Sequence, residues 1–256
     1  MLDLDCLLNV AKDAAKLAGD HLNENKQKNL KVLLNEGRDI KLQIDRDVEE
    51  LIKSEIGSQS DFPILGEESG QSDKIRDYYW VVDPLDGTSN YFRNIPICCV
   101  AIALMNKLTP VLGVVNDFNN DHLYFAHQGM EAYRNDDLIN VSKIDTKIDG
   151  TLLTGIPAKT SYTDEEFRSM IVEFQQWKKI RMIGSAAMAS AYVASGKAER
   201  YQENGIFLWD IAAGVIILSE AGGNISPLDL KQIKNHKIIA SSEIIYENLN
   251  KLLINF

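Results

Sequence analysis

The segment Asp83-Pro84-Leu85-Asp86-Gly87-Thr88-Ser89-Asn90 decides how this chain folds and what it can bind. It follows Tyr78–Val82, a run of aromatic and β-branched residues that predicts a buried strand. Pro84 restricts the backbone and lacks an N–H donor, and Asp86-Gly87 predicts a tight turn. The two carboxylates, three residues apart and separated by a rigid turn at the rim of the predicted sheet, can therefore converge on one point.

These residues offer ligands for a cation and for an anion. The carbonyl of Leu85 lies between the two aspartates, and an all-oxygen ligand set suits a hard cation such as Mg²⁺. A short helix can begin at Thr88-Ser89 and end before Pro96. The free N–H groups at its start would receive a phosphate. The alternative for Asp83 and Asp86 is a helix cap followed by an exposed turn.

Two further acidic clusters occupy similar places in the chain. Glu67-Glu68 follows the apolar run Phe62–Leu65, and Trp209-Asp210 opens the predicted helix Trp209–Ala221. Taken alone, Glu67-Glu68 could be a solvated loop and Asp210 an N-cap. Because all three acidic clusters lie at ends of predicted elements, we expect them to form one site.

The first half of the chain, residues 1–145, predicts an α+β arrangement. Apolar residues recur at helical spacing over residues 4–22 and 44–56, which predicts two amphipathic helices. Short apolar runs bounded by Gly, Asn and Asp predict a mostly antiparallel sheet. Its expected strands are 62–65, 79–82, 97–105, 111–115 and 122–125.

The second half, residues 146–256, alternates strand and helix patterns and predicts an α/β arrangement. The expected strands are 152–156, 180–183, 198–202 and 236–240. The expected helices are 164–177, 185–195, 209–221 and 243–253. The sequence has no obvious linker between the halves, so we expect one continuous core.

Composition excludes several classes of function. The formal net charge of -10 is of the wrong sign for binding a nucleic acid polymer, which requires clustered Lys and Arg. No apolar run approaches the ~20 residues that span a bilayer. The N-terminal stretch Met1–Asp5 lacks the positive charge of a signal peptide. Three cysteines form no disulfide framework, so we expect buried free thiols and a cytoplasmic protein.

The order of these motifs resembles a known signature. Asp45, Glu67-Glu68, Asp83–Thr88, Trp209-Asp210 and Gly222-Gly223 follow one another as in the lithium-sensitive, metal-dependent phosphomonoesterases. This group includes inositol monophosphatases, bisphosphate nucleotidases and fructose-1,6-bisphosphatases. The resemblance covers nearly the whole chain and implies a layered α-β-α-β-α sandwich.

Other stretches are most similar to the inositol monophosphatase branch. They are Ser89-Asn90-Tyr91-Phe92, Gly184-Ser185-Ala186 and Glu203-Asn204-Gly205. Glu131 departs from the pattern at a position that is commonly Gly, and Gly155–Lys159 is closer to bacterial members. The second departure lies near the expected substrate pocket and bears on inositol specificity.

The resemblance also implies a role for each site residue. Two or three Mg²⁺ ions would be held by Glu67, Asp83, the carbonyl of Leu85, Asp86 and Asp210. The catalytic residues would be Glu67 and a Thr88–Asp45 pair that orients and deprotonates the attacking water. The substrate would contact Gly87, Thr88, Ser89, Gly184, Ser185, Ala186, Glu203 and Asp210. The alternatives are an N-cap role for Asp45 and a surface edge-strand position for Glu203.

The implied activity is the hydrolysis of a small phosphate monoester, inositol monophosphate first, by direct attack of a metal-activated water. A homodimer and lithium sensitivity are implied with it. Alternatives with the same chemistry are a 3′(2′),5′-bisphosphate nucleotidase, a fructose-1,6-bisphosphatase and a histidinol-phosphate phosphatase. A metal-binding regulatory protein without turnover is the alternative from a different class.

Overall fold

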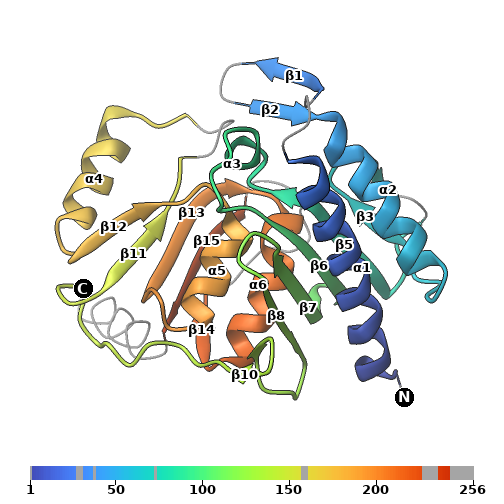
Figure 1. Cartoon of the computed structure of the whole chain (residues 1–256). Coiled ribbons are helices and arrows are strands. Elements are labelled where there is room, and N and C mark those ends of the chain that lie inside the picture. Colours follow the sequence, from blue (N-terminus) through green and yellow to red (C-terminus); the bar gives the residue numbers. More distant parts are fainter. Residues whose placement is uncertain are drawn as a thin grey trace.

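The computed structural model describes residues 2–26, 31–36, 39–71, 74–156, 161–226 and 236–242. They form five layers in the order α-β-α-β-α, as Figure 1 shows, so the predicted layered sandwich is confirmed. One outer layer holds α1 (Leu4–Asn25) and α2 (Gln43–Gly57), and the other holds α4 (Asp164–Phe174). The middle layer holds α5 (Ala186–Ala194) and α6 (Leu208–Glu220).

The first half contributes an eight-stranded sheet. Its strands are β3 (Ile64–Gly66), β4 (Gly70–Gln71), β5 (Tyr78–Asp86), β6 (Cys99–Asn106), β7 (Thr109–Asp117), β8 (His122–His127), β9 (Tyr133–Arg134) and β10 (Asp137–Leu138). Their order is β10-β9-β8-β7-β6-β5-β3-β4. Only the β3–β5 pair of this sheet is parallel. The prediction of a mostly antiparallel sheet is therefore confirmed.

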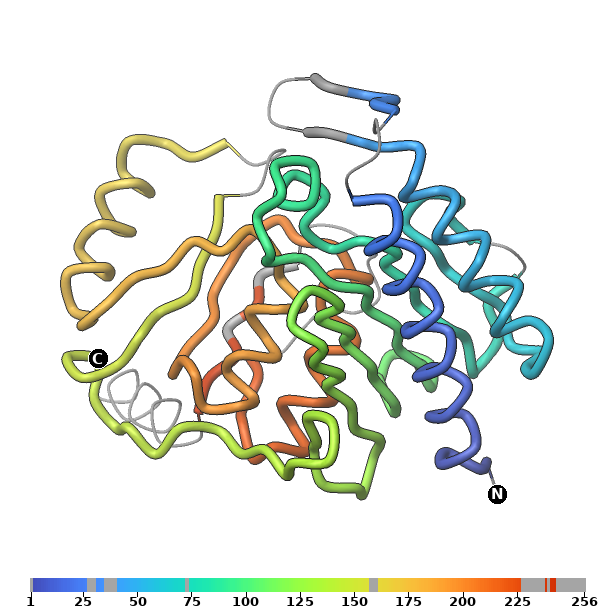
Figure 2. Tube along the Cα trace, in the orientation of Figure 1, coloured from blue at the N-terminus to red at the C-terminus, as the bar shows by residue number. Residues whose placement is uncertain are grey.

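The second half contributes a five-stranded mixed sheet. Its strands are β11 (Thr151–Thr154), β12 (Lys179–Met182), β13 (Arg200–Ile206), β14 (Gly223–Ile225) and β15 (His236–Ser242). Their order is β12-β11-β13-β15-β14, with β11 parallel to both of its neighbours. Figure 2 shows the blue-to-green first half on one side and the yellow-to-orange second half on the other.

Helices α5 and α6 join the two sheets through a shared core. Most buried residues of both helices belong to one apolar cluster with side chains from β5, β6, β13 and β15. The sequence of strand β5 does not alternate between apolar and polar residues, because both faces of the strand are covered. Tyr79 and Val81 face this cluster, whereas Trp80 and Val82 face a second cluster under α1 and α2. A strand covered on both faces needs apolar residues at every position.

Three details differ from the sequence prediction or lie beyond it. The predicted turn between Asp83 and Asp86 is wrong, because β5 continues to Asp86 with an irregular register to β6 between these residues. Strand β13 extends to Ile206, four residues beyond the predicted end. The predicted closing helix 243–253 lies outside the described residues.

Several short elements were absent from the sequence prediction, a hairpin among them, whereas the short helix expected to begin at Thr88 is present. A hairpin of β1 (Val32–Glu36) and β2 (Asp39–Leu42) precedes α2 and stands at one edge of the molecule in Figure 1. The single turn α3 (Thr88–Phe92) lies beside β2. None of the helices in the described residues is both long and apolar enough to cross a membrane.

Helix α6 approaches β7 so closely that only glycine fits at Gly113. A Cβ atom there would lie 2.5 Å from the carbonyl oxygen of Ala213 and 2.6 Å from the Ile216 side chain. Because backbone cannot yield as a flexible side chain can, the helix itself would have to move. This contact fixes the depth at which α6 lies in the core.

We expect Gly113→Ala to lower the free energy of unfolding by about 1–3 kcal/mol, because of this overpacking. Gly57→Ala is the matched control, since a Cβ at Gly57 meets nothing within 4 Å. It should leave stability unchanged or slightly raised. Urea unfolding of the two variants and the wild type measures the difference, and equal stabilities would contradict the close-contact account.

Candidate active site

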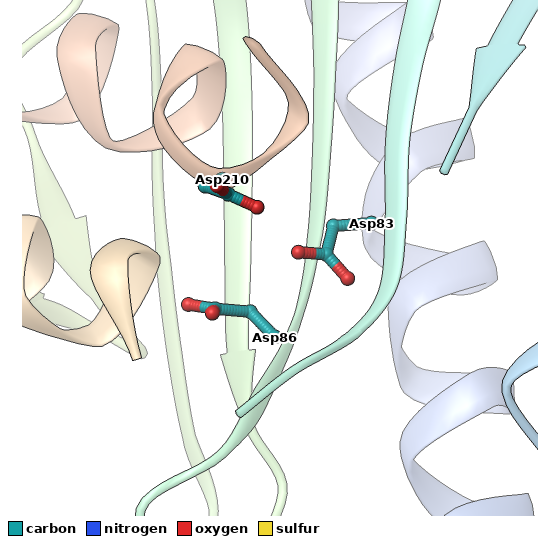
Figure 3. Close-up of side chains that lie close together, drawn as sticks. All are labelled: Asp83, Asp86 and Asp210. Carbon is teal, nitrogen blue, oxygen red and sulfur yellow. The ribbon is translucent and has the colours of Figure 1, made fainter. Parts of the chain in front are cut away.

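Three aspartates from distant parts of the chain converge between the two sheets. Asp83 and Asp86 come from the end of β5, and Asp210 comes from the first turn of α6. One carboxylate oxygen from each lies within 4.8 Å of the other two. Figure 3 shows the three carboxyl groups facing a common space. Asp83 and Asp86 are buried and Asp210 is half-buried, so the exposed-turn alternative for the first pair is wrong.

Asp86 is held by the N-terminus of α5. Its Oδ2 atom accepts hydrogen bonds from the Ser185 hydroxyl at 2.6 Å and from the Ala187 N–H at 2.7 Å. Ser185 is also the N-cap of α5 and accepts a hydrogen bond from the Met188 N–H. The positive end of the helix dipole therefore faces the carboxylate of Asp86.

The other two aspartates are oriented by nearby backbone groups. Asp83 accepts a hydrogen bond from the Leu85 N–H at 3.0 Å. Asp210 accepts one from the Phe207 N–H at 2.7 Å, so it caps α6 as the alternative interpretation expected. Each of these bonds uses one carboxylate oxygen. The capping role of Asp210 is therefore compatible with its place in the cluster.

The Glu67-Glu68 loop follows β3 and lies against the end of β5. The Glu67 N–H donates to the Val82 carbonyl, and the Glu67 carboxyl interacts with that of Asp83. The Glu68 side chain is buried and forms ion pairs with Lys41 and, at 3.6 Å, with Arg46. The solvated-loop alternative is therefore wrong for this segment.

Glu49 on α2 anchors this loop and was not among the predicted site residues. It is 1% exposed, and its two carboxylate oxygens accept hydrogen bonds from the Glu68 and Ser69 N–H groups at 2.8 and 3.0 Å. A Cβ at Gly66 would lie 2.4 Å from Glu49 Oε2. The available signal was spacing, because Glu49 follows Asp45 by four residues and shares its helix face.

Asp45 and Thr88, the predicted catalytic pair, each make a hydrogen bond to a different backbone group. Asp45 lies in the first turn of α2, where Oδ2 accepts a hydrogen bond from the Leu42 N–H at 2.8 Å, so the expected capping contact is present. Its Oδ1 atom is buried without a partner. The Thr88 hydroxyl donates to the Leu85 carbonyl at 3.1 Å. No hydrogen bond between described residues joins the two, and their pairing stays a prediction.

The carboxyl groups of the site share a raised proton affinity. Burial, followed by repulsion from neighbouring carboxylates, raises the pKa of Asp83 and of Asp210 well above the ordinary range. Burial raises the pKa of Glu67 to about 7 and that of Asp45 to about 8. It also raises the pKa of Asp86, although the hydrogen bonds from α5 oppose the shift. Divalent cations would relieve this repulsion.

A cavity of about 500 Å³ opens beside the aspartates. The predicted substrate contacts, which come from both halves of the chain, all line it: Gly87, Thr88, Ser89, Gly184, Ser185, Ala186, Glu203 and Asp210. Glu203 is half-buried and accepts a hydrogen bond from the Tyr201 hydroxyl at 3.0 Å, so its surface-position alternative is wrong. Burial raises the pKa of Glu203 to about 7.

Asn90 joins the two sides of this cavity. Its amide group donates to the carbonyls of Ile97 and Ile183, both at 2.7 Å. This ties α3 to the loop that precedes α5. The sequence match had marked Asn90 without giving it a place in the site. Apolar lining residues that were not predicted include Ile156, Met182, Ile183, Ile206 and Phe207.

A larger cavity, about 600 Å³, lies elsewhere, against α1 and the strands β7 and β8. It is lined by residues such as Lys12, Lys16 and Asp121, and none of the clustered aspartates reaches it. Size alone would favour this cavity. Chemistry favours the smaller one, because convergent polar groups with perturbed pKa values mark an active site better than volume does.

Comparison with known proteins gives a consistent result. The model described as "Inositol monophosphatase family" matches residues 3–255. The "Nus factor SuhB" of Xylella fastidiosa is 38% identical over 221 residues, which are 84% of this chain and 80% of that protein. The "Inositol-1-monophosphatase" of Mesorhizobium japonicum is 34% identical over 255 residues, which are 96% of this chain and 95% of that protein.

A solved structure agrees with these sequence relatives. The inositol monophosphatase from Anabaena (Nostoc) sp. PCC 7120 superposes with a TM-score of 0.85 and 31% sequence identity. The match covers 99% of this chain and 97% of that one.

The raised pKa values predict how the stability of the metal-free protein depends on pH. Protons bound to Asp45, Glu67 and Glu203 in the folded state are released on unfolding, because an unfolded carboxyl titrates near pH 4. Stability is therefore lost as pH rises toward the folded pKa values of about 7 to 8.

In EDTA, we expect the free energy of unfolding to fall by more than ~1 kcal/mol between pH 6 and pH 8. Saturating Mg²⁺ should reduce this dependence of stability on pH, since the ion compensates the negative charge of the carboxylates. Thermal or urea unfolding across the pH range measures it, and a metal-free stability that is flat or rises with pH would refute the prediction.

Glu49→Gln should weaken metal loading, because the amide has one acceptor oxygen where two backbone N–H groups need partners. One unpaired N–H costs about 1–3 kcal/mol and frees the loop that carries Glu67. We expect the Mg²⁺ concentration for half-maximal activity to rise by about 10-fold. Glu50→Gln is the matched control, since the Glu50 side chain is 71% exposed. An unchanged Mg²⁺ requirement in the Glu49 variant would contradict this anchoring role.

Proposed function

Because this chain belongs to the inositol monophosphatase family, we propose that it is a Mg²⁺-dependent phosphatase whose substrate is an inositol monophosphate. The observation that carries the proposal is the convergence of Asp83, Asp86 and Asp210 beside a cavity that Glu203 also lines. A phosphate and a polyol can thus be bound at the two ends of one cavity.

The donor set fits Mg²⁺. Carboxylate and carbonyl oxygens are the ligands that this ion prefers, and the buried acids would otherwise repel one another. We propose that Glu67, Asp83, Asp86 and Asp210, with the carbonyl of Leu85, hold two or three ions. Bound Mg²⁺ would supply charge that attracts the phosphate and would lower the pKa of a coordinated water.

The protein's own groups would bind and orient the substrate. Gly87, Thr88 and Ser89 line the cavity with Asp86, and their backbone N–H groups would bind the phosphate. At the other end, Glu203 would accept a hydrogen bond from a substrate hydroxyl. Its carboxylate is already fixed by Tyr201. The loop Gly184–Ala186 would line the side of the substrate.

Hydrolysis would proceed by in-line attack of water on phosphorus, without a covalent enzyme intermediate. The water's oxygen forms the new P–O bond, the ester P–O bond breaks, and the departing alcohol oxygen takes a proton. We propose that Thr88 and Asp45, beside Glu67, orient the water and accept its proton. The unpartnered Oδ1 atom of Asp45 supports this role, since it is a buried acceptor without a hydrogen bond.

We further propose a cytoplasmic, lithium-sensitive homodimer that acts on small molecules. Helix α4 buries none of its residues and exposes Phe167, Ile171 and Val172, which supports a contact with a second copy.

Cys98 and Cys99 are buried free thiols, whereas Cys6 is exposed, contrary to the prediction for all three. The net charge of -10 supports the absence of nucleic acid polymers among its partners.

Rival substrates share the phosphate end and differ at the alcohol end. They are adenosine 3′,5′-bisphosphate, fructose 1,6-bisphosphate and histidinol phosphate. Phosphate release from each, compared with inositol 1-phosphate in Mg²⁺ and in EDTA, separates them. Fastest metal-dependent release from inositol 1-phosphate is the expected result. A faster rival would overturn the substrate assignment, and no release from any ester would favour a regulatory protein.

Asp86→Asn tests the metal-site assignment. We expect turnover to fall more than ~100-fold, because an amide is a weak ligand for a hard cation. The fold should survive, since removing one charge from the cluster relieves repulsion. Asp61→Asn, at an exposed position, is the control and should keep full activity. Normal turnover in the Asp86 variant, with unchanged unfolding, would refute the assignment.

A further inference from the structure

A second cavity adjoins the candidate active site. It has a volume of about 330 Å³ and lies between α4 and the face of the five-stranded sheet. Gly155 and Glu203 line both this cavity and the one beside the aspartates. A Cβ at Gly155 would lie 2.3 Å from Glu203 Oε2, so the two residues are in direct contact. The alcohol end of the proposed substrate is thus next to a further binding space.

The wall of this cavity contains a buried cation with unused hydrogen-bonding capacity. Arg200, on β13, is 5% exposed, and its Nε atom is buried without a partner. Its described ionic contact is with Glu173, at 3.5 Å between Nη1 and Oε1. A guanidinium has five N–H donors, and burying them unpaired is unfavourable.

Glu173 does not accept a hydrogen bond from the Nε atom of Arg200, because other donors occupy its carboxylate oxygens. Lys147 Nζ donates to both of them, at 2.9 and 3.1 Å. The Trp177 indole N–H donates to Oε1 at 3.1 Å. Lys147 and Arg200 line the cavity with two carboxylates, Glu173 and Glu203, and Glu203 accepts its own hydrogen bond from the Tyr201 hydroxyl. The unpaired Nε–H of Arg200 is the donor that an entering anion would complete.

We propose that this cavity is an oxyanion subsite that binds a second acidic group, a phosphate or a carboxylate, on the alcohol part of the substrate. The inference rests on the proposed phosphatase activity, since it assigns a substrate class to that site. Gln202 and Asn204 also line the cavity from β13 and can donate amide hydrogen bonds to the same group. A guanidinium is well suited to recognise such an anion with paired N–H donors.

The subsite extends the range of phosphate esters that the chain can use. A substrate with one phosphate leaves Arg200 unpaired, whereas a substrate with a second oxyanion at the right distance pairs it. This pairing adds binding energy for such esters and leaves the contacts proposed for inositol monophosphate unchanged. We therefore expect bisphosphates to be used efficiently beside inositol monophosphate.

Arg200→Met tests the subsite, because it removes the guanidinium while keeping a long apolar side chain. The readout is kcat/KM for fructose 1,6-bisphosphate and for adenosine 3′,5′-bisphosphate, each divided by that for inositol 1-phosphate. We expect at least one ratio to fall by about 10-fold or more, the effect of a lost charge-assisted hydrogen bond. Lys178→Met removes the same charge from an exposed side chain and should leave both ratios unchanged. Equal ratios in all three proteins would overturn the substrate subsite.

A second measurement separates this inference from the proposed activity. Without metal, the cluster of Asp83, Asp86 and Asp210 offers no cation to an anion, so sulfate added in EDTA should not bind there and should bind at Arg200. We expect sulfate to raise the unfolding temperature of the wild type and of Lys178→Met more than that of Arg200→Met. If no ester is hydrolysed, the proposed function fails, and this shift alone decides the subsite. The same sulfate shift in all three proteins would then overturn it.

Discussion

The structure depends on holding three carboxylates, two buried and one half-buried, close enough to repel one another. Asp83, Asp86 and Asp210 lie within 4.8 Å by their nearest ligand atoms in a largely buried place, where like charges are costly. Hydrogen bonds from α5 and from backbone N–H groups fix each of them. Such an arrangement is favourable only when protons or cations compensate the charge. The raised pKa values and the proposed Mg²⁺ sites are two consequences of this one constraint.

The layers of the fold serve to keep that arrangement in place. Helices α5 and α6 lie between the sheets, so Asp210 and the donors to Asp86 are fixed by the same core that supports β5. The close approach of α6 to Gly113 limits any sliding of that helix. Glu49 extends the support outward to the loop that carries Glu67. The proposed chemistry thus rests on contacts far from the cavity surface.

Much of this could be predicted from the sequence, where local pattern and motif order carry the information. Apolar periodicity gave the helices and the two kinds of sheet, and residue order gave the acidic cluster. The continuation of β5 through Pro84 could not be predicted, because pairing with β6 overrides a local turn preference. Glu49 and Arg200 were missed for a related reason. Their roles depend on which distant backbone or cavity they reach, and a single charged residue does not reveal this.

Proton release on Mg²⁺ binding tests the central claim most directly. If buried carboxyls hold protons in the metal-free protein, binding must displace them. Calorimetric titration with Mg²⁺ at pH 7, repeated in buffers of different ionisation enthalpy, counts the protons released. The account predicts saturable binding with release of about one proton or more, and loss of both in Asp86→Asn. Binding without proton release, or no specific binding, would contradict it.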